Sequence, residues 1–176
     1  MQTGLDADIE ALGTLCMARG IQCAVAESCT GGLLGAHITR LPGASRWFAG
    51  GLIAYDNRVK TQLLGIEPGL VHQYGAVSEE VARGMALGVC RLLDVHAAMA
   101  ITGIAGPEGG SREKPVGFVW IGCALRTLVQ TRSFHFHGDR EEVRQAACIQ
   151  ALRLLRGHLA SRPPPHPART LQENPR

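Results

Sequence analysis

The stretch AVAESCTGGLLGA, residues 24–36, joins a short apolar run to a helix-like apolar pattern through a polar, glycine-containing turn. The apolar run predicts a buried strand over residues 21–28, and the later pattern predicts a helix over residues 30–41. Ser28 then lies where the strand turns into the helix. Free backbone N–H groups at a helix start favour an anion or a developing oxyanion, so this turn is a candidate catalytic loop.

Strand and helix patterns alternate along the rest of the chain, and two strand patterns stand together near its end. Further strands are predicted over residues 47–55, 96–103, 116–125 and 128–136. Further helices are predicted over residues 5–20, 56–65, 78–94 and 139–159. This order predicts an α/β protein, a three-layer α/β/α sandwich around a mixed, mostly parallel sheet of about five or six strands. We expect residues 1–160 to form a single domain and the Pro-rich residues 161–176 to form a disordered tail.

Composition excludes several classes of protein and partner. The formal net charge of +3 is too small and too scattered for a nucleic-acid-binding surface. No segment approaches the roughly 18 continuous apolar residues of a transmembrane helix, and the acidic N-terminus does not resemble a signal peptide. The six cysteines form no CxxC pair, which favours reduced core residues over a zinc site or a disulfide framework. We therefore expect a cytoplasmic protein with no metal and no cofactor.

Three polar or glycine-rich loops follow three of the predicted strands, at residues 27–32, 55–60 and 102–110. Ligands of open α/β sheets usually bind outside the carboxyl ends of the strands. If these three strands are parallel, the loops share one edge of the sheet and surround one pocket.

The first loop offers a nucleophile. At a strand-to-helix turn the Ser28 hydroxyl can project into solvent, while Thr30, Gly31 and Gly32 open the helix with free amides. The alternative is simple helix capping by Ser28 or Thr30, with the glycines allowing close packing. Cys29 is a rival nucleophile, but its side chain should point away from that of Ser28, so we expect a core thiol.

The second loop offers a base for that nucleophile. None of the seven histidines falls in the three loops, whereas Tyr55 ends a strand and Lys60 lies in the first turns of the next helix. A partly desolvated lysine near a helix N-terminus has a lowered pKa and can act as a neutral base toward a serine. The alternative for Lys60 is a solvated charge on the helix surface.

The third loop contains neither a dinucleotide-binding nor a P-loop pattern, yet its backbone amides could bind an anion or complete an oxyanion hole. Lys114 and Arg140 are possible anion partners, with ordinary surface charge as the alternative. The candidate binding residues in this region are Thr102, Gly103, Gly106 and Arg140.

Seven blocks of the sequence resemble, in order, the signature blocks of the CinA C-terminal domain family over roughly residues 5–158. The blocks are AESCTGGLL, PGAS, GGLIAYDNRVKTQLLGI, GAVSEEVARGMA, AITGIAGPEGG, KPVGFVWIG and GDREEVR. The resemblance implies a three-layer α/β/α domain that hydrolyses the carboxamide of nicotinamide mononucleotide, giving nicotinate mononucleotide and ammonia without a metal. It also implies a homodimer or higher homo-oligomer acting on a small nucleotide, while the composition predicts no nucleic-acid or membrane partner.

The resemblance assigns roles to residues of this chain. Ser28 matches the family nucleophile, and Lys60 and Tyr55 match its basic and hydroxyl partners. Substrate and oxyanion contacts are implied for Thr30, Gly31, Gly32, Thr102 and Gly103. Glu108 departs from the family pattern, in which a smaller or neutral residue is expected at this position. An acid there that points into the pocket would repel a substrate phosphate.

Two other functions stay open on the sequence. The pocket could hold a nucleotide without hydrolysing it, as a regulatory module linked to competence or DNA damage. Alternatively, the same serine could serve an amidase or esterase for another substrate, because the sequence specifies the nucleophile better than the leaving group.

Overall fold

The structure is a computed structural model that describes residues 2–161, with the backbone alone described for residues 2 and 3. The predicted disordered tail lies outside the described residues, apart from Ser161. The elements in chain order are α1 (Gln2–Ala18), β1 (Cys23–Glu27), α2 (Leu33–Arg40), the 3-10 helix η1 (Ala44–Arg46), β2 (Phe48–Ile53), α3 (Asn57–Gln62), α4 (Pro68–Tyr74), α5 (Glu79–Leu92), β3 (Ala97–Gly103), β4 (Phe118–Leu125), β5 (Leu128–His135) and α6 (Arg140–Ala160).

The sheet has five strands in the order β2-β1-β3-β4-β5. Strand β1 pairs in parallel with both β2 and β3, whereas β4 is antiparallel to β3 and to β5. The predicted mixed sheet and its late hairpin are therefore confirmed. The three parallel strands end at the same edge, which brings together the loops that follow them.

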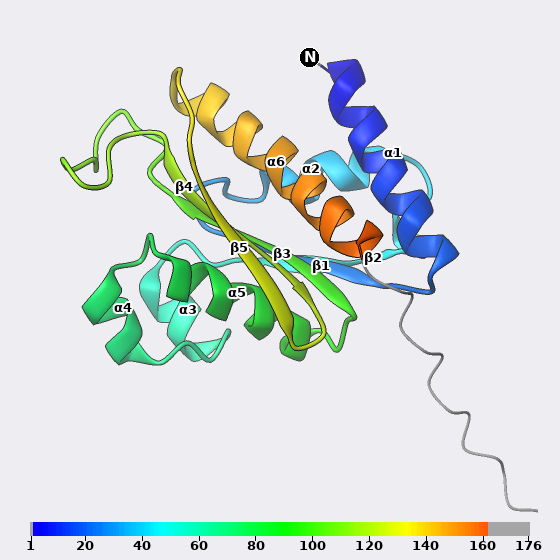
Figure 1. The fold of residues 1–176 in the computed structure, drawn as a ribbon, viewed down its shortest axis with the longest axis horizontal. Helices are drawn as coiled ribbons and strands as arrows, with labels where there is room; N and C mark the ends of the chain where they lie inside the picture. The colour runs from blue at the N-terminus through cyan, green and yellow to red at the C-terminus, as the bar shows by residue number, and fades with distance from the viewer. Residues whose placement is uncertain (1, 162–176) are drawn as a thin grey trace, which may run out of the picture.

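The helices cover both faces of the sheet, as the sequence predicts. Figure 1 shows α1, α2 and α6 on one face and α3, α4 and α5 on the other. Strand β1 is buried along its whole length, with Cys23 and Val25 in the core under α1, α2 and α6. Ala24 and Ala26 alternate with them and belong to the core on the α5 side. Burial on both faces explains why this strand is a continuous apolar run.

Helix α5 approaches its neighbours closely because small residues face it. Ala98 and Ala100 of β3 lie in the core that it covers. A Cβ atom on Gly88 of α5 would lie 2.3 Å from the backbone oxygen of Leu64, just after α3. Helix α5 thus packs directly against the segment that follows α3, the helix that carries Lys60.

The cysteines and the helices bear on two of the features considered from composition. All six cysteines are buried with free thiols. No helix within residues 2–161 combines the length and the apolar character needed to cross a membrane.

Candidate active site

A pocket of about 250 Å³ lies at the carboxyl ends of β1, β2 and β3. It is lined by Ser28, Cys29, Tyr55, Asn57, Lys60, Ala76, Val77, Thr102, Gly103, Ile104, Ala105, Gly106, Glu108, Gly109 and Arg140. All three predicted loops contribute to it, together with the first residue of α6. The parallel arrangement of the strands thus gathers most of the residues that the sequence singles out.

Ser28 directly follows β1, and its backbone is held by β3. The Ser28 amide donates to the Ile101 carbonyl at 2.9 Å, which extends the parallel pairing by one residue. Within the described part of the chain, the Ser28 hydroxyl makes no hydrogen bond. The hydroxyl therefore lines the pocket without a protein partner that a ligand would have to displace.

Lys60 is the most deeply buried cation of the pocket, with 1% of its surface exposed. Its Nζ donates to the backbone oxygen of Tyr55 at 3.0 Å and to Oδ1 of Asn57 at 3.4 Å. Burial lowers the pKa of the Lys60 amine, and the nearby Asp56 carboxylate opposes this effect in part. The alternative of a solvated helix charge is therefore wrong, because the fold turns this side chain inward.

The Tyr55 phenol lies beside Arg140. The side chain of Tyr55 is 62% exposed, and its hydroxyl accepts a hydrogen bond from Arg140 Nη2 at 3.4 Å. Arg140 Nη1 also donates to the Gly106 carbonyl at 2.7 Å. Lys60 thus contacts the backbone of Tyr55, and the hydroxyl expected to partner Lys60 instead joins the β2–α3 loop to the start of α6.

The amides that open α2 are already occupied, which corrects the expectation of free donors at Gly31 and Gly32. The buried Glu27 carboxylate accepts from the Gly32 and Leu34 amides at 3.0 and 3.1 Å and from the Gly35 amide at 2.8 Å. The Gly31 amide donates to the Ser28 carbonyl at 3.1 Å. The start of the helix therefore stabilises the loop instead of presenting an anion site.

Thr30, Gly31 and Gly32 do not belong to the described lining of the pocket. Gly31 and Gly32 have φ angles of +60° and +95°, a conformation that glycine adopts without steric cost. The Thr30 hydroxyl is buried without a hydrogen-bond partner in the described residues, and the Thr30 carbonyl accepts from Arg144 of α6 at 2.8 Å. These three residues shape the loop behind Ser28 and lie outside the pocket.

Cys29 belongs to the buried core, as expected, and it also lines the pocket beside Ser28. Burial raises the pKa of its thiol to about 11, so the thiol stays protonated near neutral pH. Among the described residues, its backbone amide contacts only its own thiol and has no acceptor on another residue, unlike the amides of Gly31 and Gly32. The amide of the residue directly after a nucleophile is a common component of an oxyanion hole.

The third loop shapes the opposite wall. The Thr102 hydroxyl donates to the Ala76 carbonyl at 2.8 Å, so it fixes the α4–α5 connection. A Cβ atom on Gly103 would lie 2.6 Å from Cγ2 of Val119, so a larger residue would displace β4. Glu108 is exposed and lines the pocket, so an acid does reach this site.

Other candidates from the sequence lie elsewhere. Lys114 Nζ donates to the Tyr74 carbonyl at 2.8 Å, and the His37 ring contacts Gln145 at 2.9 Å. In the part of the chain that the structure describes, no group of three or more His, Cys, Asp or Glu side chains could hold a metal ion.

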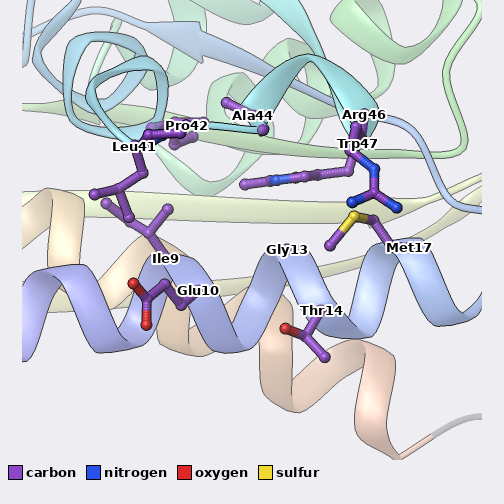
Figure 2. Close-up of a pocket in the computed structure, with 12 residues that line it drawn as sticks. Ile9, Glu10, Gly13, Thr14, Met17, Leu41, Pro42, Ala44, Arg46 and Trp47 are labelled. Atoms are coloured by element: carbon purple, nitrogen blue, oxygen red, sulfur yellow. The ribbon is translucent and has the colours of Figure 1, made fainter.

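A second hollow, of about 150 Å³, lies between α1 and residues 41–47 (Figure 2). Figure 2 shows Trp47 beside α1 at Gly13, where a Cβ atom would lie 2.7 Å from the indole Nε1. None of the residues that the sequence singles out for chemistry lines this hollow. The pocket at the strand ends is therefore the candidate active site.

The family model of the CinA C-terminal domain matches residues 6–159 of this chain. The chain belongs to the CinA family. A CinA-like protein of Geotalea daltonii is 49% identical over 144 residues, which are 82% of this chain and 35% of that relative. A protein of Moorella thermoacetica named putative competence-damage inducible protein is 47% identical over 143 residues, 81% of this chain and 34% of its own length. This chain thus spans about a third of the length of these curated relatives.

Solved structures of the CinA superfamily share the fold. The Klebsiella pneumoniae protein KP700603 aligns with a TM-score of 0.86 and 30% identity over 89% of this chain and 98% of its own. The competence/damage inducible protein CihA of Agrobacterium tumefaciens aligns with a TM-score of 0.85 and 34% identity over 89% of this chain and 96% of its own. The CinA three-layer architecture is therefore present in this chain.

Proposed function

We propose that this CinA-family chain is a serine amidohydrolase that converts nicotinamide mononucleotide into nicotinate mononucleotide and ammonia. The observation that carries the proposal is the pairing in one pocket of an unpartnered serine hydroxyl with a buried lysine. A pocket that only binds a nucleotide has no need of a buried lysine in the same lining as a serine hydroxyl, because burial of a cation costs free energy.

The first half-reaction forms an acyl-enzyme. The Ser28 oxygen attacks the carboxamide carbon, and its proton passes to the neutral amine of Lys60. The amide of Cys29 leaves its weak contact with the Cys29 thiol and donates to the carbonyl oxygen as negative charge develops there. The resulting ammonium of Lys60 gives its proton to the leaving nitrogen, so ammonia departs and Lys60 is neutral again.

The second half-reaction releases the acid. Water attacks the ester carbon, Lys60 accepts the proton of the water, and the ester bond to Ser28 breaks. Lys60 then returns the proton to the Ser28 oxygen, which restores the starting enzyme. The net reaction consumes one water and releases ammonia and the carboxylic acid.

The charges of the pocket suit a zwitterionic nucleotide. The N-glycosylated pyridine ring of nicotinamide mononucleotide is a cation, which the carboxylate of Glu108 would attract. Arg140 supplies a guanidinium for the phosphate at the Tyr55 side of the pocket. A Glu108 carboxylate that faces the ring therefore favours binding of this substrate, although an acid is unexpected at this position of the family pattern.

A product panel tests the proposed function. The chain is incubated with nicotinamide mononucleotide, nicotinamide riboside and nicotinamide, and both ammonia and the acid product are quantified by chromatography. We expect turnover of the mononucleotide, with lower kcat/KM for the two smaller amides. Binding of the mononucleotide without any acid product would instead favour the regulatory binding module, and turnover of another amide alone would favour a different amidase.

A further inference from the structure

Among the described residues, Asn57 supplies the one side-chain acceptor for the Lys60 amine. Nζ has two hydrogen-bond acceptors among the described residues, and the other is the backbone oxygen of Tyr55. The backbone contact is set by the β2–α3 loop, whereas the 3.4 Å contact to Asn57 Oδ1 depends on a side chain. Asn57 is the first residue of α3, and it lines the same pocket as Lys60.

The orientation of the Asn57 amide follows from its partner. A lysine nitrogen that is protonated has donors only, so the oxygen of the amide faces it. An amide oxygen accepts a hydrogen bond from either protonation state of the lysine but brings no net charge. A carboxylate at the same distance would strongly favour the charged ammonium.

The neighbouring acid is directed elsewhere. Asp56 caps α3, and its Oδ1 accepts from the Arg58 amide at 2.7 Å while its carboxylate pairs with the Arg58 side chain. Its effect on Lys60 is outweighed by burial. The titratable and charged groups that act on Lys60 or share its pocket are Asp56, Cys29, Tyr55, Glu108 and Arg140.

We propose that Asn57 is a positioning residue, which orients the Lys60 amine at the edge of the pocket through a contact that adds no charge. The inference rests on the proposed function only in that Lys60 serves Ser28 as a base. It goes beyond that function by assigning a role to Asn57. That role requires an uncharged side chain as well as a hydrogen-bond acceptor.

The chain offers a direct way to test this role, because Lys60 and Lys114 are its only lysines. Lysine labelled with ¹³C at Cε gives two NMR signals, and Lys114→Arg assigns them. The Lys60 signal is titrated in wild type, Asn57→Asp, Asn57→Ala and Gln62→Glu. Gln62→Glu is the matched control, since it adds the same charge at an exposed position of the same helix.

We expect Asn57→Asp to raise the Lys60 midpoint by about one pH unit or more, and Gln62→Glu to move it far less. Asn57→Ala should not raise it, because no charge is added. The acid limb of the pH profile of kcat/KM should shift with the midpoint, so that Asn57→Asp regains activity at alkaline pH. A rise in both Asn57 variants, or in neither, overturns the proposal.

The two proposals fail separately. A wild-type chain that does not hydrolyse nicotinamide mononucleotide contradicts the proposed function, while the NMR titration still decides the role of Asn57. Where Asn57→Asp does not fold, Asn57→Ser replaces it for the kinetic test. Asn57→Ser should then lower kcat at least tenfold with KM changed less than about threefold, and an unchanged kcat would contradict the positioning role.

Discussion

The Glu27 carboxylate accepts a hydrogen bond from the Gly35 amide at 2.8 Å, so the residue before Ser28 is tied to the helix that follows it. Two further amides of the same turn, those of Gly32 and Leu34, contact the same carboxylate. Strand, nucleophile loop and helix are thus joined by one buried side chain. We expect the position of the Ser28 hydroxyl to depend on this contact, although Glu27 does not belong to the described lining of the pocket.

Glu27→Gln should therefore reduce both stability and turnover. An amide has one acceptor oxygen and places an N–H₂ group against backbone donors, so we expect a loss of about 2 kcal/mol in the free energy of unfolding. Urea denaturation measures this loss, and Glu10→Gln, at an exposed position of α1, is the matched control. Equal stability of the two variants would show that the carboxylate is not required.

Lys60→Met should remove activity while leaving the fold intact. Loss of a general base lowers kcat by about 10²–10⁴-fold. Because burial holds the folded-state pKa below the ordinary 10.5, the unfolded chain binds more protons between these two values. The free energy of unfolding of wild type therefore rises with pH across this window.

The Lys60→Met variant should lack that rise. Its stability relative to wild type is greatest below the folded-state pKa of Lys60 and declines as pH approaches 10.5. Denaturation at several pH values measures the difference, with Lys114→Met as the control. A stability difference that does not change with pH would mean that Lys60 has the same pKa in both states.

Arg140→Lys should weaken substrate binding more than it slows the chemical step. A lysine cannot contact the Gly106 carbonyl and the Tyr55 hydroxyl in the forked manner of the guanidinium. We expect KM to rise roughly tenfold with a smaller change in kcat. Arg83→Lys, at a half-exposed position of α5, is the control, and a fall in kcat alone would place Arg140 in the chemical step instead.

Gly88→Ala should destabilise the protein despite the better helix propensity of alanine. The new Cβ atom would lie 2.3 Å from the Leu64 backbone oxygen, and overpacking of this kind costs about 1–3 kcal/mol. For Gly4→Ala on α1, no described atom beyond the neighbouring residues and backbone of the same helix lies within 4 Å of the new Cβ, so this variant should be neutral or stabilising. Thermal unfolding of both variants tests whether α5 requires this close approach.

Much of the fold could be predicted because its signals are local. The buried run around Val25 and the serine cap of α5, where Ser78 accepts from the Val81 amide at 3.3 Å, follow from patterns of a few residues. Helix α4 was not predicted, since its seven residues bury no side chain and its Pro68 and Gly69 resemble a turn. Leu70 and Val71 of α4 pack partly buried against the core, and two adjacent apolar residues leave no helical period in the sequence.

The sequence could predict which loops form the candidate site, but it could not predict the side-chain contacts within that site. Parallel strands bring Ser28 and Lys60 to one pocket, and that follows from topology alone. The capping role of Glu27 was missed because the acid comes from the preceding strand, not from the residue next to the helix. A charged residue ending an apolar strand before two glycines was the available signal. The direction of the Tyr55 ring depends on Arg140, which is 85 residues away.

The most direct test of the central claim is ammonia release from nicotinamide mononucleotide by wild type, Ser28→Ala and Ser133→Ala, each checked for folding by circular dichroism. Ser133 lies on the exposed face of β5 and is the matched serine control. We predict that wild type and Ser133→Ala release ammonia at equal rates and that Ser28→Ala is slower by about 10³-fold or more. A folded Ser28→Ala protein that retains the wild-type rate would contradict the assignment of Ser28 as the nucleophile.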